Sequence, residues 1–164
     1  LADFRREVSL TLHRAVAEDV PLDNVDLEIK GMRLSANAAP LDCARAMLPA
    51  LLQMAQEEAG PLHDGRKQAS RLLKRFRKLL QQYVGPTHGH QVDIVYELQE
   101  AAEEEPALEP LFAHTLAYLY KLDVVEEDAV QTWERESMES GDTQWLDLAE
   151  QFLTWLREAE EESD

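Results

Sequence analysis

The sequence has few of the features that mark secreted, membrane-spanning or disulfide-stabilised proteins. Its single cysteine, Cys43, excludes an internal disulfide and indicates a reducing compartment. Its apolar runs are all well short of the roughly 20 residues that a membrane-crossing helix requires. Residues 1–5 lack the layout of a signal peptide. We therefore expect a cytoplasmic domain cut from a longer chain.

Motifs of nucleotide-binding and covalent chemistry are also missing. The chain contains no GxxxxGK[ST], GxGxxG or GxSxG stretch, and its many carboxylates form no particular acid/base pair. His88 and His90 lie in a Gly/Pro turn without a neighbouring cysteine, so we expect neither a metal nor another cofactor. These absences argue against an enzyme that makes or breaks bonds.

Helical periodicity dominates the chain, and its six glycines and few β-branched runs argue against a sheet. Short turns marked by proline or glycine favour antiparallel pairs stacked as a HEAT-like α-solenoid, with a compact bundle as the alternative. We expect one domain over residues 1–164 that ends in an acidic tail, 158–164, and Pro49 should kink or break its helix. The pattern predicts an all-α fold of about eight helices, over residues 2–18, 22–37, 41–58, 64–84, 90–103, 107–122, 126–138 and 142–159.

Positive charge is scarce in the second half of the chain. Residues 1–87 carry 13 basic and 11 acidic side chains, whereas residues 88–164 carry 3 basic and 22 acidic ones. Nearly all of the formal charge of −17 therefore arises after residue 87. Such a field repels nucleic acid and anionic lipid and attracts basic segments, so we expect a basic protein partner and no direct contact with nucleic acid or membrane.

The helix predicted over residues 22–37 carries an isolated carboxylate. Glu28 shares a narrow polar strip with Asn24 and Ser35, between two apolar edges. Asp26 and Arg33 fall on another arc, which is typical of solvated surface. The pattern leaves two interpretations of Glu28 open. It is either partly held and open to a partner, or a surface glutamate paired with a basic residue of an adjacent helix.

Trp155 lies at the edge of the apolar face of the last predicted helix, where we expect it to be half exposed. An exposed tryptophan beside charged residues is typical of a binding hot spot. The pattern supports equally well a tryptophan that folds over the rim of the core. Trp133, by contrast, falls on the register of core residues. The acids that follow Trp155 oppose the dipole of their helix, so solubility or a basic partner must account for them.

The segment 66–78 is the most basic part of the chain. Such a helix could bind phosphate or lie on a membrane. We favour a solvated face that offsets the acidic half.

Three stretches together resemble the nucleotide-exchange domain at the C-terminal end of the epsilon subunit of translation initiation factor 2B. The first joins Phe4-Arg5-Arg6-Glu7-Val8 to residues 24–37, whose core is Leu27-Glu28-Ile29. Residues 119–133 and 152–163 resemble the two aromatic/acidic boxes of this class. The boxes are shared with initiation factors 5 and 4G, whereas the Leu27-Glu28-Ile29 core and the acidic ending select the epsilon subunit.

This resemblance implies a HEAT-like fold and release of GDP from initiation factor 2, a heterotrimeric GTPase, without covalent chemistry. It places the family's essential glutamate on Glu28 and its key tryptophan on Trp155. The positions that it marks beside the glutamate are Thr11, Asn24, Arg33 and Ser35. Those that it assigns to partner binding are Tyr120, Asp123, Glu126, Glu127, Trp133, Glu158, Glu160, Glu161 and Glu162.

The implied partners are the lysine-rich beta subunit and the GTPase gamma subunit of initiation factor 2, and other subunits of factor 2B through the parent chain. Two alternatives stay open. One is an adaptor that binds the same lysine-rich tail without accelerating exchange, like the C-terminal domain of factor 5. The other is a scaffold that docks a kinase or another initiation factor, as in factor 4G.

Overall fold

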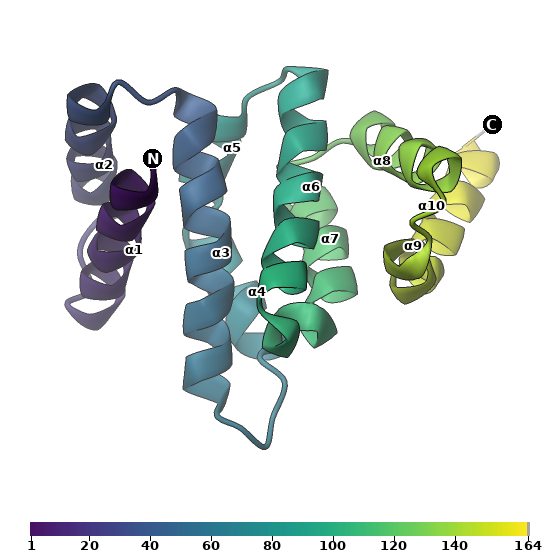
Figure 1. Ribbon diagram of the computed structural model, residues 1–164, viewed down its shortest axis with the longest axis horizontal. Coiled ribbons are helices and arrows are strands. Elements are labelled where there is room, and N and C mark those ends of the chain that lie inside the picture. Colours follow the sequence, from purple (N-terminus) through teal and green to yellow (C-terminus); the bar gives the residue numbers. More distant parts are fainter. Residues whose placement is uncertain (164) are drawn as a thin grey trace.

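The helices form a row of successive layers along the long axis of the molecule, from the N-terminal helices at one end to the C-terminal helices at the other (Figure 1). The computed structural model describes residues 1–163, and within them no strand forms. The all-α prediction is therefore confirmed. In chain order the elements are α1 (Ala2–Ala17), α2 (Leu22–Ala36), α3 (Pro40–Ala59), α4 (Arg66–Arg75), α5 (Arg77–Val84), α6 (His88–Glu104), the 3₁₀ helix η1 (Pro106–Leu111), α7 (Phe112–Lys121), α8 (Glu127–Ser140), α9 (Gln144–Leu148) and α10 (Glu150–Ser163).

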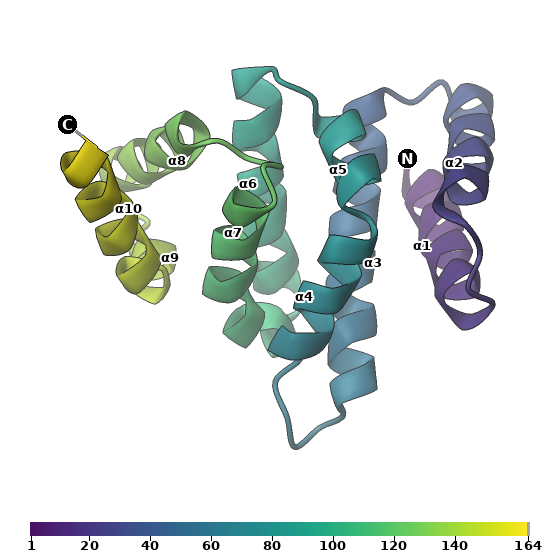
Figure 2. The ribbon, with the colours of Figure 1, turned by 180° about the vertical axis from the view of Figure 1, so that it is seen from behind.

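Helices α3 and α6 join the successive layers of this row. α1 packs on α2 and α3, α3 contacts α4, α5 and α6, and α6 contacts α8. From behind, α4 and α5 cover α3, and α7 covers α6 (Figure 2). Helices α1 and α2 form one end of the row, and α9 and α10 form the other. A HEAT-type repeat stays a prediction, because this arrangement alone does not define one.

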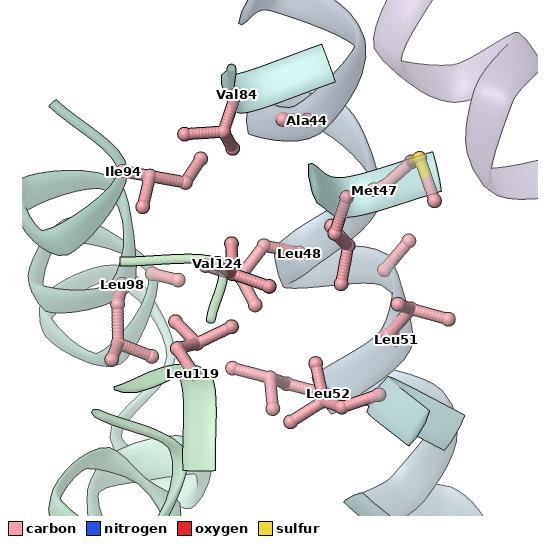
Figure 3. Close-up of a cluster of buried hydrophobic side chains, with 14 of the residues drawn as sticks. Ala44, Met47, Leu48, Leu51, Leu52, Val84, Ile94, Leu98, Leu119 and Val124 are labelled. Carbon is pink, nitrogen blue, oxygen red and sulfur yellow. The ribbon is translucent and has the colours of Figure 1, made fainter. Parts of the chain in front are cut away.

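A continuous cluster of buried side chains runs through the layers, from Phe4 to Leu156. In the middle of the row Leu48 and Leu52 of α3 face Leu98 of α6 across the core (Figure 3). Each fully buried leucine stabilises the fold by about 1.5–3 kcal/mol relative to an exposed one. Since these residues recur at helical spacing, the same periodicity that predicts the helices also positions the core.

Local chemistry sets several helix ends. Pro40 occupies the first turn of α3, where its missing N–H costs nothing. The Asp42 carboxylate accepts a hydrogen bond of 2.9 Å from the Ala39 N–H just before that turn. Asn37 and Gly141 take left-handed conformations after α2 and α8, with φ of 53° and 80°.

The fourth predicted helix is interrupted at Phe76, which is buried and separates α4 from α5. Arg75 Nη2 donates to the carbonyl of Ala15 at 3.1 Å. Arg77 Nε donates to the carbonyl of Leu122 at 2.9 Å. The arginines on the two sides of Phe76 thus bind different neighbours, at the point where α4 gives way to α5.

Prolines account for another difference from the predicted helices. The sixth predicted helix begins as η1, because Pro110 has no N–H to donate back to the carbonyl of Pro106. The expected break at Pro49 does not occur. Helix α3 continues through it, with Leu48 and Ala50 buried on either side. A single lost backbone hydrogen bond is outweighed there by packing.

The last predicted helix is divided at Ala149, which is fully buried between α9 and α10. The predicted acidic tail, in contrast, is not a separate segment. Residues 158–163 continue α10, in keeping with the high helix propensity of glutamate and alanine. Asp164 lies outside the described residues. None of the helices described is both long and apolar enough to cross a membrane.

A buried carboxylate joins three layers of the row. Glu97 of α6 is only 4% exposed and accepts hydrogen bonds from Arg5 of α1 at 2.9 and 3.2 Å. It also accepts one from Arg45 Nε of α3 at 3.0 Å. The hydrogen bond to Glu97 raises the pKa of Arg45. Since the carboxylate is almost completely buried, its two arginine partners offset the cost of burying its charge.

Replacing Glu97 with alanine should therefore lower the free energy of unfolding by about 2 kcal/mol, the scale of hydrogen bonds to a charged group. Glu100→Ala on the exposed side of the same helix is the matched control, with an expected change within about 0.5 kcal/mol. Urea unfolding measures both. Equal midpoints for the two variants would contradict a structural role of the Glu97 cluster.

Candidate functional site

Three aromatic side chains from α7 and α10 form a cluster at one end of the row. Tyr120 lies 5.8 Å from Phe152 and 6.1 Å from Trp155, and the last two are stacked at 6.2 Å between ring centroids. Trp155 is 53% exposed, as the helical pattern predicts. This aromatic cluster (Tyr120, Phe152 and Trp155) brings the stretches 119–133 and 152–163 together on the surface.

Carboxylates from the same two stretches also meet, between α8 and α10. Gln131 Nε2 donates to Glu127 Oε1 at 3.2 Å and to Glu160 Oε2 at 3.3 Å, bridging α8 and α10. Burial raises the pKa of Glu127, and repulsion by Glu160 adds to the shift. Two carboxylates held this close favour an added positive charge. We refer to Glu127 and Glu160 as the acidic cluster.

The other predicted acids lie on the segment before α8 and on α10. Glu126 is exposed, and its backbone N–H donates to Gln91 Oε1 at 2.8 Å. Asp123, two residues after the end of α7, has a left-handed conformation and pairs with Arg77 at 3.3 Å. The remaining ones, all exposed on α10, are Glu158, Glu161 and Glu162.

Glu28 lies on α2 and forms an ion pair with α1. Both of its carboxylate oxygens are 2.5 Å from Arg14 Nη2, and 39% of its side chain is exposed. The hydrogen bond to Glu28 raises the pKa of Arg14. The structure therefore combines the two interpretations of Glu28, which is paired with a neighbouring helix and still reaches solvent. Arg14 was not predicted as part of the site, although its spacing from Thr11 places both on one side of α1.

The comparisons with known proteins agree on one family. Residues 90–164 match the family described as W2: eIF4-gamma/eIF5/eIF2-epsilon. The chain is 32% identical over 169 residues to the translation initiation factor eIF2B subunit epsilon of Dictyostelium discoideum, covering 98% of this chain and 24% of that protein. The same subunit of Schizosaccharomyces pombe is 31% identical over 166 residues, 99% of this chain and 24% of that protein.

The second half of the chain is similar to the W2 family. The resemblance to eIF2B epsilon is confirmed, and a domain of a translation initiation factor is the coarse function that follows. The chain spans about a quarter of the length of those epsilon relatives. Human eIF5-mimic protein 1 is also similar, 25% identical over 161 residues that cover 98% of this chain and 38% of that protein.

Within the W2 region, Trp133 needs correction as a partner-binding residue. It is completely buried, and its indole Nε1 donates to Gln99 Oε1 at 2.9 Å. Its ring packs against Phe112 at 5.8 Å. A side chain without exposed surface cannot contact a partner directly. Trp133 instead holds α8 against α6 and α7.

The positions predicted beside Glu28 divide into two groups. Thr11 Oγ1 contacts Met32 Sδ at 3.8 Å across the α1–α2 interface that also holds Glu28. Asn24 and Ser35 are exposed on α2. Arg33 belongs to the second group, because it lies on another side of α2.

Arg33 and Asp26 are half-buried, so the expectation of ordinary solvated surface is wrong for both. Arg33 Nη1 donates a hydrogen bond to the carbonyl of Ala38 at 3.1 Å. The Asp26 carboxylate accepts a hydrogen bond of 2.5 Å from the Tyr83 hydroxyl. Both line a pocket of about 220 Å³ together with Cys43. Burial raises the pKa of Cys43 to about 11, which keeps the thiol protonated and unreactive.

The arginines of the basic segment 66–78 are paired with acids of neighbouring segments. Arg75 pairs with Asp19 at 3.2 Å, and Arg71 pairs with Glu58. This pairing favours the solvated face over a phosphate-binding helix. Among residues 1–163, no three His, Cys, Asp or Glu side chains gather closely enough to hold a metal ion.

The crowded carboxylate of Glu127 predicts a pH-dependent effect on stability. A raised pKa in the folded state means that ionisation above the usual range of a glutamate costs stability. Glu127→Gln should therefore raise the free energy of unfolding at pH 7 by less than about 1 kcal/mol for this partly solvated pair, and with it the thermal midpoint. Near pH 3 it should change neither. Glu139→Gln, exposed on the same helix, is the control. A lower midpoint at pH 7 for Glu127→Gln would contradict the repulsion.

Proposed function

We propose that this chain is a guanine-nucleotide exchange domain that promotes GDP release from translation initiation factor 2. The observation that carries the proposal is the extent of the match to eIF2B epsilon. It covers 98% of the chain and so includes the half that holds Glu28 as well as the W2 region. We further propose that the domain acts in the cytoplasm, as part of a longer chain within factor 2B.

In the first step the W2 end recruits the lysine-rich segment of the beta subunit of factor 2. The sequence after residue 87 has 22 acidic against 3 basic residues, so attraction is long-ranged and speeds encounter. At short range, lysines meet the acidic cluster, and the exposed face of Trp155 adds a cation–π contact. The acidic cluster gives this surface its charge, and the aromatic cluster gives it a fixed shape.

In the second step Glu28 meets the GTPase gamma subunit at the opposite end of the row. Exchange requires only that the domain binds the nucleotide-free GTPase more tightly than the GDP-bound form. The solvent-exposed side of the Glu28 carboxylate supports this role, because Arg14 occupies only part of its hydrogen-bonding capacity. Thr11 and Ser35 border the same contact. The row of helices would then act as a rigid HEAT-like spacer.

An adaptor that binds lysine-rich segments without promoting exchange is the second candidate. The match to eIF5-mimic protein 1 over 98% of the chain favours it, although the identity there is lower. Both candidates use the W2 surface in the same way. They differ only in whether Glu28 changes the rate of GDP release.

Glu28→Ala should slow GDP release from factor 2 about tenfold or more, within the range of typical coupling free energies. Its thermal stability should stay nearly unchanged, because an exposed ion pair contributes only about 0–1 kcal/mol. The double variant Arg14→Glu/Glu28→Arg is the matched control, since it restores the ion pair with reversed charges. It should remain inactive if the carboxylate itself meets the GTPase.

Trp155→Ala separates recruitment from exchange. It should raise the domain concentration needed for half-maximal GDP release about tenfold, as expected for a hot-spot residue, and leave the maximal rate in place. Added salt should have the same effect on the wild-type domain. Binding of factor 2 with no acceleration of GDP release by the wild-type domain would reject the exchange function and support the adaptor.

A further inference from the structure

Arg14 of α1 contacts two carboxylates at the end of the molecule that α1 and α2 form. These two helices pack against each other and lie side by side in both views of the ribbon (Figures 1 and 2). Arg14 Nη2 lies 2.5 Å from both carboxylate oxygens of Glu28 on α2. Its other terminal nitrogen, Nη1, lies 3.9 Å from Oε2 of Glu18, one helical turn further along the chain. One guanidinium therefore serves two acids.

The contact with Glu28 uses only one nitrogen of the guanidinium. In the strongest arginine–carboxylate pairs, two nitrogens bind two oxygens in parallel. Here Nη2 alone contacts both oxygens, which leaves Nη1 for Glu18. The hydrogen bond to Glu28 raises the pKa of Arg14 most, and the charge of Glu18 adds to the shift. Arg14 can therefore leave Glu28 without losing its second ionic partner.

All three side chains reach solvent. The exposed fraction of the side chain is 39% for Glu28, 46% for Arg14 and 63% for Glu18. Ion pairs this exposed are weak, because water competes for both charges. A shift of the guanidinium from one carboxylate to the other therefore costs little free energy.

A second cation bound to Glu28 would lie close to Arg14. The lone pairs of Glu28 that Arg14 leaves open belong to the same small carboxylate, so a cation that binds them comes near the guanidinium. Two positive charges so close together repel each other even near a protein surface. Movement of Arg14 toward Glu18 relieves this repulsion and keeps both acids paired.

We propose that Arg14 is a positioning residue that Glu28 and Glu18 share, and that a cationic side chain of the GTPase displaces it from Glu28 toward Glu18. This inference rests on the proposed function, because it concerns how the Glu28 contact forms. In the free domain Arg14 holds the Glu28 carboxylate. In the complex Glu18 accepts the displaced guanidinium. Arg14 and Glu18 thus set the affinity of the contact, whereas Glu28 itself acts on GDP release.

Neutral variants of the two α1 residues test this proposal in the GDP-release assay with initiation factor 2. Arg14→Gln removes the competing cation, so the domain concentration needed for half-maximal release should fall about threefold, on the scale of an exposed ion pair. Glu18→Gln removes the acid toward which Arg14 moves, so this concentration should rise about twofold. The maximal rate should stay in place in both variants, because Glu28 is intact.

The double variant Arg14→Gln/Glu18→Gln distinguishes displacement from a general effect of charge. Without Arg14 there is no guanidinium for Glu18 to accept, so the double variant should behave like Arg14→Gln alone. Arg6→Gln and Asp3→Asn are the matched controls, since these two residues form another exposed ion pair on α1, at 3.8 Å. Arg6 lies about 12 Å before Arg14 along the helix, beyond the Debye length at physiological salt, so neither control should change the half-maximal concentration.

Urea unfolding of the domain alone tests the sharing of Arg14 without the GTPase. A double-mutant cycle over Arg14→Gln and Glu18→Gln gives the coupling between these two residues. Glu28→Gln should release Arg14 to Glu18 and strengthen this coupling about twofold, as a ratio of unfolding equilibrium constants. A coupling that is the same with and without the Glu28 carboxylate would show that the guanidinium is not shared.

The outcomes separate this proposal from the proposed function. If the wild-type domain accelerates GDP release but the two single variants leave the half-maximal concentration unchanged, or act additively in the double variant, displacement is overturned and exchange stands. A lower maximal rate in Arg14→Gln would mean that Arg14 only holds Glu28 in place, which also overturns displacement. If the wild-type domain does not accelerate GDP release, the exchange function is rejected and this proposal is rejected with it.

Discussion

Trp133 fixes the last layer of helices to the rest of the molecule. Its indole donates to Gln99 on α6, and its ring packs on Phe112 of α7, which in turn packs edge-on against Trp145 of α9 at 4.9 Å. All three rings are buried. The aromatic and acidic clusters combine side chains of α7, α8 and α10, so they exist only while this joint holds those helices together. Trp133, which has no exposed surface, thus determines the shape of the surface that these two clusters form.

Ion pairing differs between the two halves of the chain. In the first half, arginines reach acids on other helices, as in Arg14–Glu28 and Arg71–Glu58, and Glu97 binds two of them. The second half has 3 basic residues, of which Arg157 is paired with Glu134. Most acids there have no cation to neutralise them. Their mutual repulsion opposes folding, and salt screens it. A bound cationic ligand would also reduce this repulsion.

The features that local pattern decides were predictable from the sequence. Helical spacing gave the all-α fold and the partial exposure of Trp155, because both depend on a period of 3.6 residues. The interruption at Phe76 was not predictable, since it depends on arginines that bind carbonyls of distant helices. The pairing of Arg14 with Glu28 likewise depends on how α1 meets α2. The periodicity of a single helix predicts neither the interruption nor this ion pair.

Trp133 shows a different limit. Its register already indicated the core, but the resemblance placed it among partner-binding residues because it falls within a family motif. Motifs transfer residue identity and say nothing about exposure. The burial of Glu97 could not be predicted from its own helix, because it depends on Arg5 of α1 and Arg45 of α3.

The separation of Glu28 from Trp155 along the row has a consequence for affinity. Under the proposed function, a partner held at one end by its flexible segment would be confined near the other end, so the second contact would form at a high effective concentration. Neither contact then has to be strong alone, and each can dissociate quickly. A shorter or more flexible stack of helices would weaken binding through both contacts, even if the residues of each contact were unchanged. The proposed function would therefore make the spacing between the two ends itself a determinant of binding.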